Sequence, residues 1–197
     1  MSFLSDAEIV AQALDAYHRQ SVAAEQPAIH LRPLPEIIEQ LNLDAFVRDG
    51  GLTGPALSAF LEQYFSYATR LHHPAYLAHQ VSAPYYAGAL GSLIDGFTNN
   101  AMAIYEMGPG PTSIEYFMIN WLLEKVGWPQ QPLDIAQRTG GSGAADFAAG
   151  ILTHGGSLAN LTALLIARNQ AAPSAWNDGA PEDLVVLAPQ VAHYSMA

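Results

Sequence analysis

Gly155, Gly156 and Ser157 are the residues of this sequence whose types and spacing best suit binding chemistry. They lie between a short apolar stretch, 150–153, and the stretch 157–168, in which apolar residues recur at helical spacing. Backbone N–H groups at the start of a helix, with the positive end of its dipole, favour an anion such as phosphate. Glycine lets a bulky anion approach the main chain, and the Ser157 hydroxyl would add a donor. A helix cap without a ligand explains the same residues, so both interpretations stay open here.

His193 is the second candidate for chemistry. It follows the apolar run 184–188, and α/β sheets place their ligand sites just beyond the carboxyl ends of strands. A flat, titratable imidazole can cover a ring and still donate a hydrogen bond or a proton. A capping or surface histidine is the alternative interpretation from the residues alone.

The elements that must position these residues follow from apolar periodicity. Ser5 and Glu8 have the spacing of a capping box, which predicts a helix from Ser5 to about residue 25. Further periodicity predicts helices over 36–41, from 55 to about 72, and over 84–106, 112–126 and 157–168. The apolar runs 150–153 and 184–188 fit buried strands. Helices followed by strand, helix and strand predict an α/β protein with a helical N-terminal part.

Two parallel strands joined by one helix do not make a stable sheet with both faces covered. We therefore expect the natural protein to contain more sheet than this sequence encodes. Either the chain is a fragment, or a second polypeptide completes its fold.

Composition narrows the functional classes. The chain has 197 residues, half of them hydrophobic, and a formal net charge of −11. This charge argues against a nucleic-acid or anionic-membrane surface, for which clustered basic residues are usual. The absence of cysteine excludes disulfides, thiolate metal sites and cysteine nucleophiles. No HExxH motif occurs, so we expect no metal. The N-terminus resembles neither a signal peptide nor a membrane span, which makes the cytoplasm the default location.

Four segments in order resemble one known family. They are HPAYLAHQVSAP (73–84), NNAMAIYEMGPGPTSIE (99–115), GILTHGGSLANLTALLIAR (150–168) and APQVAHYSMA (188–197). Together they resemble the N-terminal portion of a group II pyridoxal-phosphate-dependent amino-acid decarboxylase. The resemblance implies fold type I, the aspartate-aminotransferase-like fold. A helical arm, residues 1–111, would wrap the partner subunit of a homodimer, and residues 112–197 would begin the large cofactor-binding domain.

The same resemblance assigns roles to particular residues. Gly155, Gly156 and Ser157 match the positions that hold the phosphate of pyridoxal 5'-phosphate, and His193 matches the catalytic histidine that stacks on the pyridine ring near the substrate carboxylate. Residues His79, Gln80 and Ser82 match a segment that lines the substrate entrance. The implied reaction converts an L-amino acid to its amine and carbon dioxide.

One expected residue is missing. The family forms a Schiff base through a lysine that lies far beyond the matching segments, whereas the one lysine of this sequence is Lys125. The isolated chain is therefore predicted to be inactive. Two alternatives remain at this stage: a non-catalytic pseudo-enzyme or assembly subunit, and an α/β enzyme that uses the glycine turn for a nucleotide phosphate.

Overall fold

The computed structural model describes residues 2–77, 80–134 and 147–196. The chain forms two compact units, Met1–Phe97 and Thr98–Ala197. The predicted division into an arm, 1–111, and a cofactor domain, 112–197, remains a prediction.

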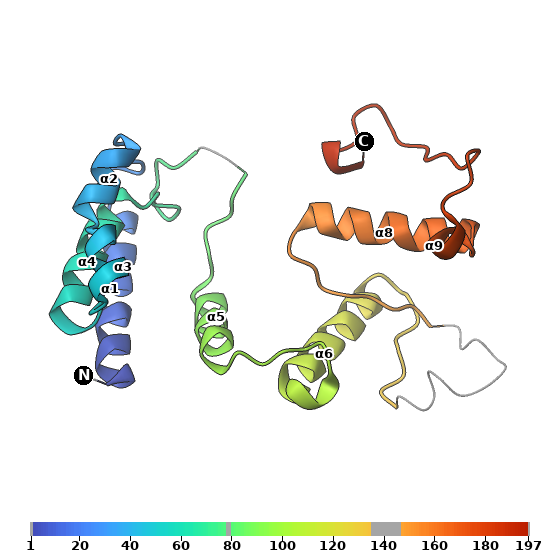
Figure 1. Ribbon diagram of the computed structural model, residues 1–197, viewed down its shortest axis with the longest axis horizontal. Coiled ribbons are helices and arrows are strands. Elements are labelled where there is room, and N and C mark those ends of the chain that lie inside the picture. Colours follow the sequence, from blue (N-terminus) through green and yellow to red (C-terminus); the bar gives the residue numbers. More distant parts are fainter. Residues whose placement is uncertain (1, 78–79, 135–146, 197) are drawn as a thin grey trace. The chain divides into compact units, whose positions relative to one another are not determined.

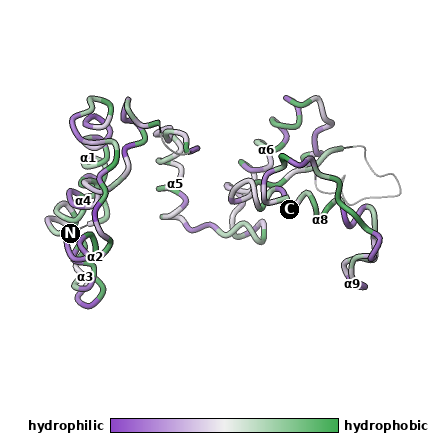
Figure 2. The backbone as a smooth tube through the Cα atoms, turned by 90° about the horizontal axis from the view of Figure 1, so that it is seen from above, coloured by the Kyte–Doolittle hydropathy of each residue, from purple (hydrophilic) through white to green (hydrophobic). Residues whose placement is uncertain are grey.

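The first unit consists of helices. In chain order they are α1 (Phe3–Val22), α2 (Leu34–Gln40), α3 (Leu43–Asp49), α4 (Gly54–Tyr67) and α5 (Tyr86–Thr98, which ends one residue into the second unit) (Figure 1). Helices α1 and α4 lie side by side, and hydrophobic and hydrophilic residues alternate along both (Figure 2). The Tyr17 and Phe65 rings meet between them at 4.8 Å. The amphipathic helices expected from periodicity therefore form and pack.

The boundaries of several helices correct the predictions, among them α4, which ends at Tyr67 rather than near residue 72. The capping box of α1 uses Ser2 and Ser5, not Ser5 and Glu8: the Ser2 hydroxyl accepts from the Ser5 N–H, and the Ser5 hydroxyl accepts from the Ser2 N–H. Helix α5 ends at Thr98 rather than near residue 106, because Asn99 adopts a left-handed conformation, with φ 46°, that a helix cannot continue. Helix α3 was not predicted; it begins after Asn42, another residue with positive φ.

A buried arginine, Arg70, binds to residues near the C-terminal end of α1. The Arg70 side chain is only 4% exposed, and its Nη1 donates to the Tyr17 carbonyl at 3.1 Å and to Ser21 Oγ at 2.9 Å. Its guanidinium lies over the Tyr17 ring, 4.6 Å from the centroid. Burial raises the pKa of the Tyr17 phenol, and the charge of Arg70 opposes that rise.

The second unit is built on α6 (Pro109–Lys125), which follows the short 3-10 turn η1 (Tyr105–Met107). Asn120 exchanges two hydrogen bonds with the Gln131 backbone, at 2.9 and 3.0 Å, and the Tyr116 hydroxyl donates to Pro132 O at 2.7 Å. Helix α8 (Gly156–Ala171), the short α9 (Ala175–Asp178) and the 3-10 turn η2 (Tyr194–Met196) complete the unit. The predicted helices 112–126 and 157–168 correspond to α6 and α8.

The predicted strands do not form. Residues 150–153 and 184–188 pair with no neighbour as a ladder anywhere in the described ranges. The prediction that both runs are buried is also wrong: Ile151 is 63% exposed, and exposure at 185–187 ranges from 62% to 95%. A strand needs another strand for its backbone hydrogen bonds, and the described residues supply none to these runs. Their contacts with α6 and α8 leave most of their large side chains exposed. The α/β character of the chain is therefore not seen in this structure.

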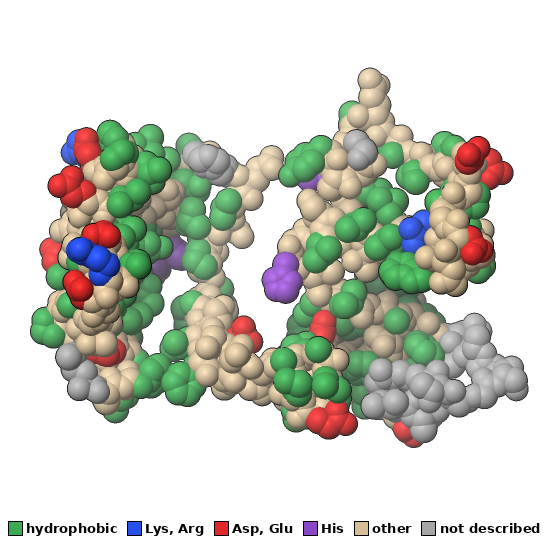
Figure 3. Space-filling model, viewed as in Figure 1, with side chains coloured by type: hydrophobic (Ala, Val, Ile, Leu, Met, Phe, Trp, Pro, Cys, Tyr) green, Lys and Arg blue, Asp and Glu red, His purple; other side chains and the backbone are tan. Residues whose placement is uncertain are grey.

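Hydrophobic side chains are widespread on the visible surface of both units (Figure 3). They include one face of α5, where Leu90, Leu93, Ile94 and Phe97 are each more than half exposed. None of the helices in the described ranges is both long enough and apolar enough to cross a membrane.

Candidate cofactor site

The turn before α8 has a conformation that requires glycine. Gly155, the N-cap of α8, has φ 100° and ψ 166°, a region that residues with a side chain rarely adopt. A Cβ atom built on either Gly155 or Gly156 would meet no atom within 4 Å. The main chain at this turn is therefore open to a ligand from outside.

The start of α8 presents unused hydrogen-bond donors. The first N–H with a backbone acceptor is that of Ala159, which donates to the Gly155 carbonyl at 3.2 Å. The N–H groups of Gly156, Ser157 and Leu158 precede it, and within the described part of the chain nothing accepts from them. The exposed Ser157 hydroxyl also has no partner there. These four donors, at the positive end of a helix dipole, suit an anion.

Helix α6 holds the segment that leads into this turn. The Glu115 carboxylate accepts a hydrogen bond from the Leu152 N–H at 3.0 Å. A Cβ at Gly150 would come within 3.0 Å of a methyl group of the buried Ile119, so the glycine allows close packing on α6. The turn is thus carried by a side chain and a tight contact rather than by a sheet.

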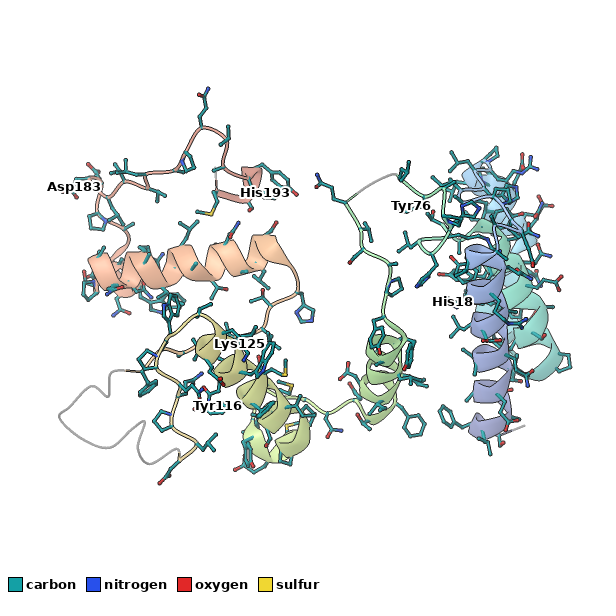
Figure 4. All side chains as sticks on the ribbon, turned by 180° about the vertical axis from the view of Figure 1, so that it is seen from behind. His18, Tyr76, Tyr116, Lys125, Asp183 and His193 are labelled. Atoms are coloured by element: carbon teal, nitrogen blue, oxygen red, sulfur yellow. The ribbon has the colours of Figure 1, made fainter. Side chains whose placement is uncertain are left out.

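The C-terminal segment runs back along α8. Leu184, Val185 and Val186 line an apolar cavity of about 380 Å³ with residues of the C-terminal half of α8, from Leu164 to Ala171. At the other end, η2 contacts α8, and Asp183 and His193 lie over opposite ends of that helix (Figure 4). This path brings His193 to the end of α8 that begins with Gly156.

His193 is held there by two polar side chains and one ring. Its Nδ1 lies 2.8 Å from Ser195 Oγ, and Ser195 Oγ accepts a hydrogen bond from Asn160 Nδ2, also at 2.8 Å. The Tyr194 ring lies against the imidazole, with centroids 4.1 Å apart. The imidazole itself remains exposed.

The structure therefore brings together some of the predicted site residues. Gly155, Gly156, Ser157 and His193 all lie at one end of α8. Gln80 and Ser82 belong to the first unit, where both are exposed. His79 lies outside the described residues. Their predicted roles at the substrate entrance remain predictions.

Neither Ser195 nor Asn160 was predicted as a site residue from the sequence. A signal was available for Asn160, since it lies three residues after Ser157 and so faces the same side of the helix. No comparable signal marks Ser195, because its contact with Asn160 joins residues 35 positions apart.

Two further observations concern the surroundings of the site. A second cavity, of about 260 Å³, lies against α6 and is lined by Thr112, Glu115, Ile119, Gly150 and others, so neither cavity includes Ser157 or His193. The candidate site is an open turn rather than an enclosed pocket. A search of the described residues finds no cluster of three or more histidine, aspartate or glutamate side chains that could hold a metal ion.

Comparison with known proteins gives this arrangement a context. The chain is 28% identical over 123 residues to an L-2,4-diaminobutyrate decarboxylase of Acinetobacter baumannii, covering 62% of this chain and 21% of that protein. It is 29% identical over 142 residues to an aromatic-L-amino-acid decarboxylase of Bacillus atrophaeus, covering 70% and 26%. An acidic amino acid decarboxylase of Mus musculus is 24% identical over 191 residues, covering 96% and 30%. The chain thus spans less than a third of the length of these relatives.

The family model described as the pyridoxal-dependent decarboxylase conserved domain matches residues 61–197, more than half of the chain. That range contains the glycine turn, α8 and His193. The chain therefore belongs to the pyridoxal-dependent decarboxylase family, whose cofactor is pyridoxal 5'-phosphate.

Proposed function

We propose that the natural protein carrying this chain decarboxylates an L-amino acid to its amine, and that this chain supplies part of the phosphate site and the imidazole that covers the cofactor ring. The observation that supports this proposal is the return of the C-terminal segment along α8, which sets His193 over the helix end that offers free donors. Family membership supplies the reaction class.

The donors at the start of α8 fit a phosphate group. Three backbone N–H groups and the Ser157 hydroxyl have no acceptor in the described residues. Because they lie at the positive end of the helix dipole, they suit a dianion. The absence of a Cβ at Gly155 and Gly156 leaves room for phosphate oxygens close to the main chain. In this proposal Gly155 shapes the turn, Gly156 gives access, and Ser157 adds the side-chain bond.

His193 suits the ring of the same cofactor. Because Tyr194 packs against the imidazole, the ring is supported while it remains exposed. A supported imidazole can cover a pyridine ring and hold the substrate carboxylate in a fixed direction. When bound, the cofactor supplies an electron-accepting ring that stabilises the charge left as carbon dioxide departs.

Lys125 does not suit attachment to that cofactor. Its ammonium lies 3.7 Å from the Glu124 carboxylate and 5.3 Å from the centre of the Trp121 ring, at the C-terminal end of α6. Figure 4 shows it on a different helix from the one that His193 covers. We propose that the attachment lysine belongs to another part of the natural protein, and that the isolated chain is inactive.

Partners and substrate selection complete the proposal. The exposed apolar face of α5 supports a role for the N-terminal region as an arm that packs against a second subunit or against the rest of the protein. His79, Gln80 and Ser82 are proposed to meet the substrate side chain. A cytoplasmic location is proposed as well. The relatives are named for different substrates, namely diaminobutyrate, aromatic and acidic amino acids, and share decarboxylation as the reaction in their names.

The test uses the complete natural polypeptide that carries this sequence. Pyridoxal 5'-phosphate is titrated and followed by absorbance, and carbon dioxide release is measured with diaminobutyrate, aromatic and acidic amino acids. Ser157→Ala should weaken cofactor affinity about tenfold, the size of one charge-assisted hydrogen bond. Thr162→Val is the matched control, because that hydroxyl donates to the Leu158 carbonyl within the same helix and is not one of the four free donors.

Two results would overturn the proposal. One is cofactor binding that is equal in the wild type and in Ser157→Ala. The other is tight binding of a nucleotide at this turn without binding of pyridoxal 5'-phosphate, which would instead support the nucleotide-phosphate enzyme. Cofactor binding without release of carbon dioxide from any amino acid would favour the pseudo-enzyme.

A further inference from the structure

The Nδ1 atom of His193 accepts a hydrogen bond. The backbone N–H of Ser195 donates to His193 Nδ1 at 3.3 Å, and a backbone N–H can only donate. Nδ1 therefore carries no proton in this arrangement. The proton of the neutral imidazole must then be on Nε2.

The direction of the Ser195 hydroxyl proton follows from this assignment. It lies 2.8 Å from the same Nδ1, and because Nδ1 is an acceptor, the single hydroxyl proton must point to it. The lone pairs of Ser195 Oγ are left to accept, and Asn160 Nδ2 donates to them at 2.8 Å. A reversed Asn160 amide would present its oxygen and compete for the one hydroxyl proton. Only one arrangement satisfies all three contacts.

The chain of hydrogen bonds from Asn160 through Ser195 to His193 joins two elements of the second unit. Asn160 is in the second turn of α8, while Ser195 and His193 are in and next to η2. Asn160 and Ser195 are both partly shielded from water, whereas the imidazole is exposed. The two shielded groups can therefore hold the exposed ring in one orientation over the start of α8.

We propose that Asn160 and Ser195 are positioning residues that hold His193 as the Nε2–H tautomer, with Nε2 directed away from η2 as a hydrogen-bond donor. The tautomer follows from the contacts of this chain; the use of that donor toward a bound carboxylate or cofactor oxygen rests on the proposed function. An imidazole with a proton on Nδ1 would lose the bond from the Ser195 N–H, would donate to the Ser195 hydroxyl instead of accepting from it, and would offer an acceptor at Nε2 where a donor is needed.

The experiment uses the complete natural polypeptide with ¹⁵N-labelled histidine rings, first without cofactor and at mildly alkaline pH. Long-range ¹H–¹⁵N spectra distinguish the two tautomers, and His193→Asn identifies the His193 signals. We expect the wild type to show one fixed Nε2–H form. In Ser195→Ala and Asn160→Ala the two ring nitrogens should move toward the averaged signals of a freely exchanging imidazole. Ser195→Thr, which keeps the hydroxyl, should restore the wild-type signals.

Cofactor affinity is then measured on the same proteins. Ser195→Ala and Asn160→Ala should each weaken binding of pyridoxal 5'-phosphate about fivefold, the size of one ordinary hydrogen bond, and Ser195→Thr should not. Ser157→Ala should weaken binding while leaving the His193 signals unchanged.

These two measurements separate the two proposals. A proton on Nδ1 in the wild type, or identical ring signals in the wild type and Ser195→Ala, would overturn the positioning role whatever the cofactor does. Failure of pyridoxal 5'-phosphate to bind the wild type, with the tautomer as expected, would overturn the proposed function and leave the tautomer assignment in place.

Discussion

The Glu115 carboxylate accepts the backbone N–H of Leu152 at 3.0 Å, so a side chain of α6 takes the place that a neighbouring strand would occupy. This bond, together with the close packing of Gly150 on Ile119, holds the segment that leads into the glycine turn. The geometry of the proposed phosphate site therefore depends on a residue that does not touch the phosphate.

Glu115→Ala should free this segment. We expect amide exchange at Leu152 to accelerate about fivefold, equivalent to about 1 kcal/mol for one lost hydrogen bond, with a similar loss of cofactor affinity. Glu115→Gln keeps an acceptor oxygen and should show little change in either measurement. Equal exchange in the alanine and glutamine variants would show that the carboxylate does not hold the segment.

Gly155→Ala should damage the turn itself. Because Gly155 has φ 100°, an alanine there is strained by about 1 to 3 kcal/mol, which thermal denaturation and cofactor titration should both detect. Gly156→Ala is the matched control, since that residue is already in the first turn of α8 and its Cβ would meet no atom within 4 Å. It should keep the thermal stability of the wild type. Any loss of cofactor affinity in this variant would report a Cβ in the space that the phosphate needs.

Arg70→Ala should destabilise the first unit. The change removes both Nη1 hydrogen bonds and the packing on Tyr17, and we expect a loss of about 2 to 3 kcal/mol in the free energy of unfolding measured in urea. Arg19→Ala provides the comparison in the same unit. Its partner Asp15 is 2.8 Å away, but both side chains are more than 60% exposed, so its removal should cost less than about 1 kcal/mol. Similar losses in the two variants would contradict the structural role given to Arg70.

The raised pKa of Tyr17 predicts how the free energy of unfolding responds to alkaline pH. Burial raises the pKa of its phenol in the folded state above the ordinary value of 10.0, which applies to the unfolded state. Between the unfolded-state pKa and the folded-state pKa, the folded state therefore binds more protons than the unfolded state. The free energy of unfolding should therefore fall as pH rises above about 10. Tyr17→Phe has no phenol to titrate, and its stability should decline less steeply over the same range. Identical slopes for the two proteins would show that Tyr17 does not contribute.

Local features of the fold were readable from the sequence. Pro55, a residue suited to the first turn of a helix, lies at the second position of α4, and the helix expected at 157–168 lies within α8. The glycine turn was also predicted, because its requirement for positive φ at Gly155 depends on the chain within a few residues. Helical periodicity, proline and glycine act over such short distances. They predict which residues share a face without reference to the rest of the molecule.

Contacts between distant residues were decided by the tertiary structure alone. The pairing of Asn160 with Ser195 depends on how the chain returns along α8, and the burial of Arg70 depends on α1 packing beside α4. The apolar runs 150–153 and 184–188 show the opposite case: their composition suits buried strands, yet in the described residues neither has a partner strand. The sequence determined most of the helices and the glycine turn before α8 because these are local. The setting of His193 and the state of the two extended runs depend on what packs against them, which only the three-dimensional path of the chain decides.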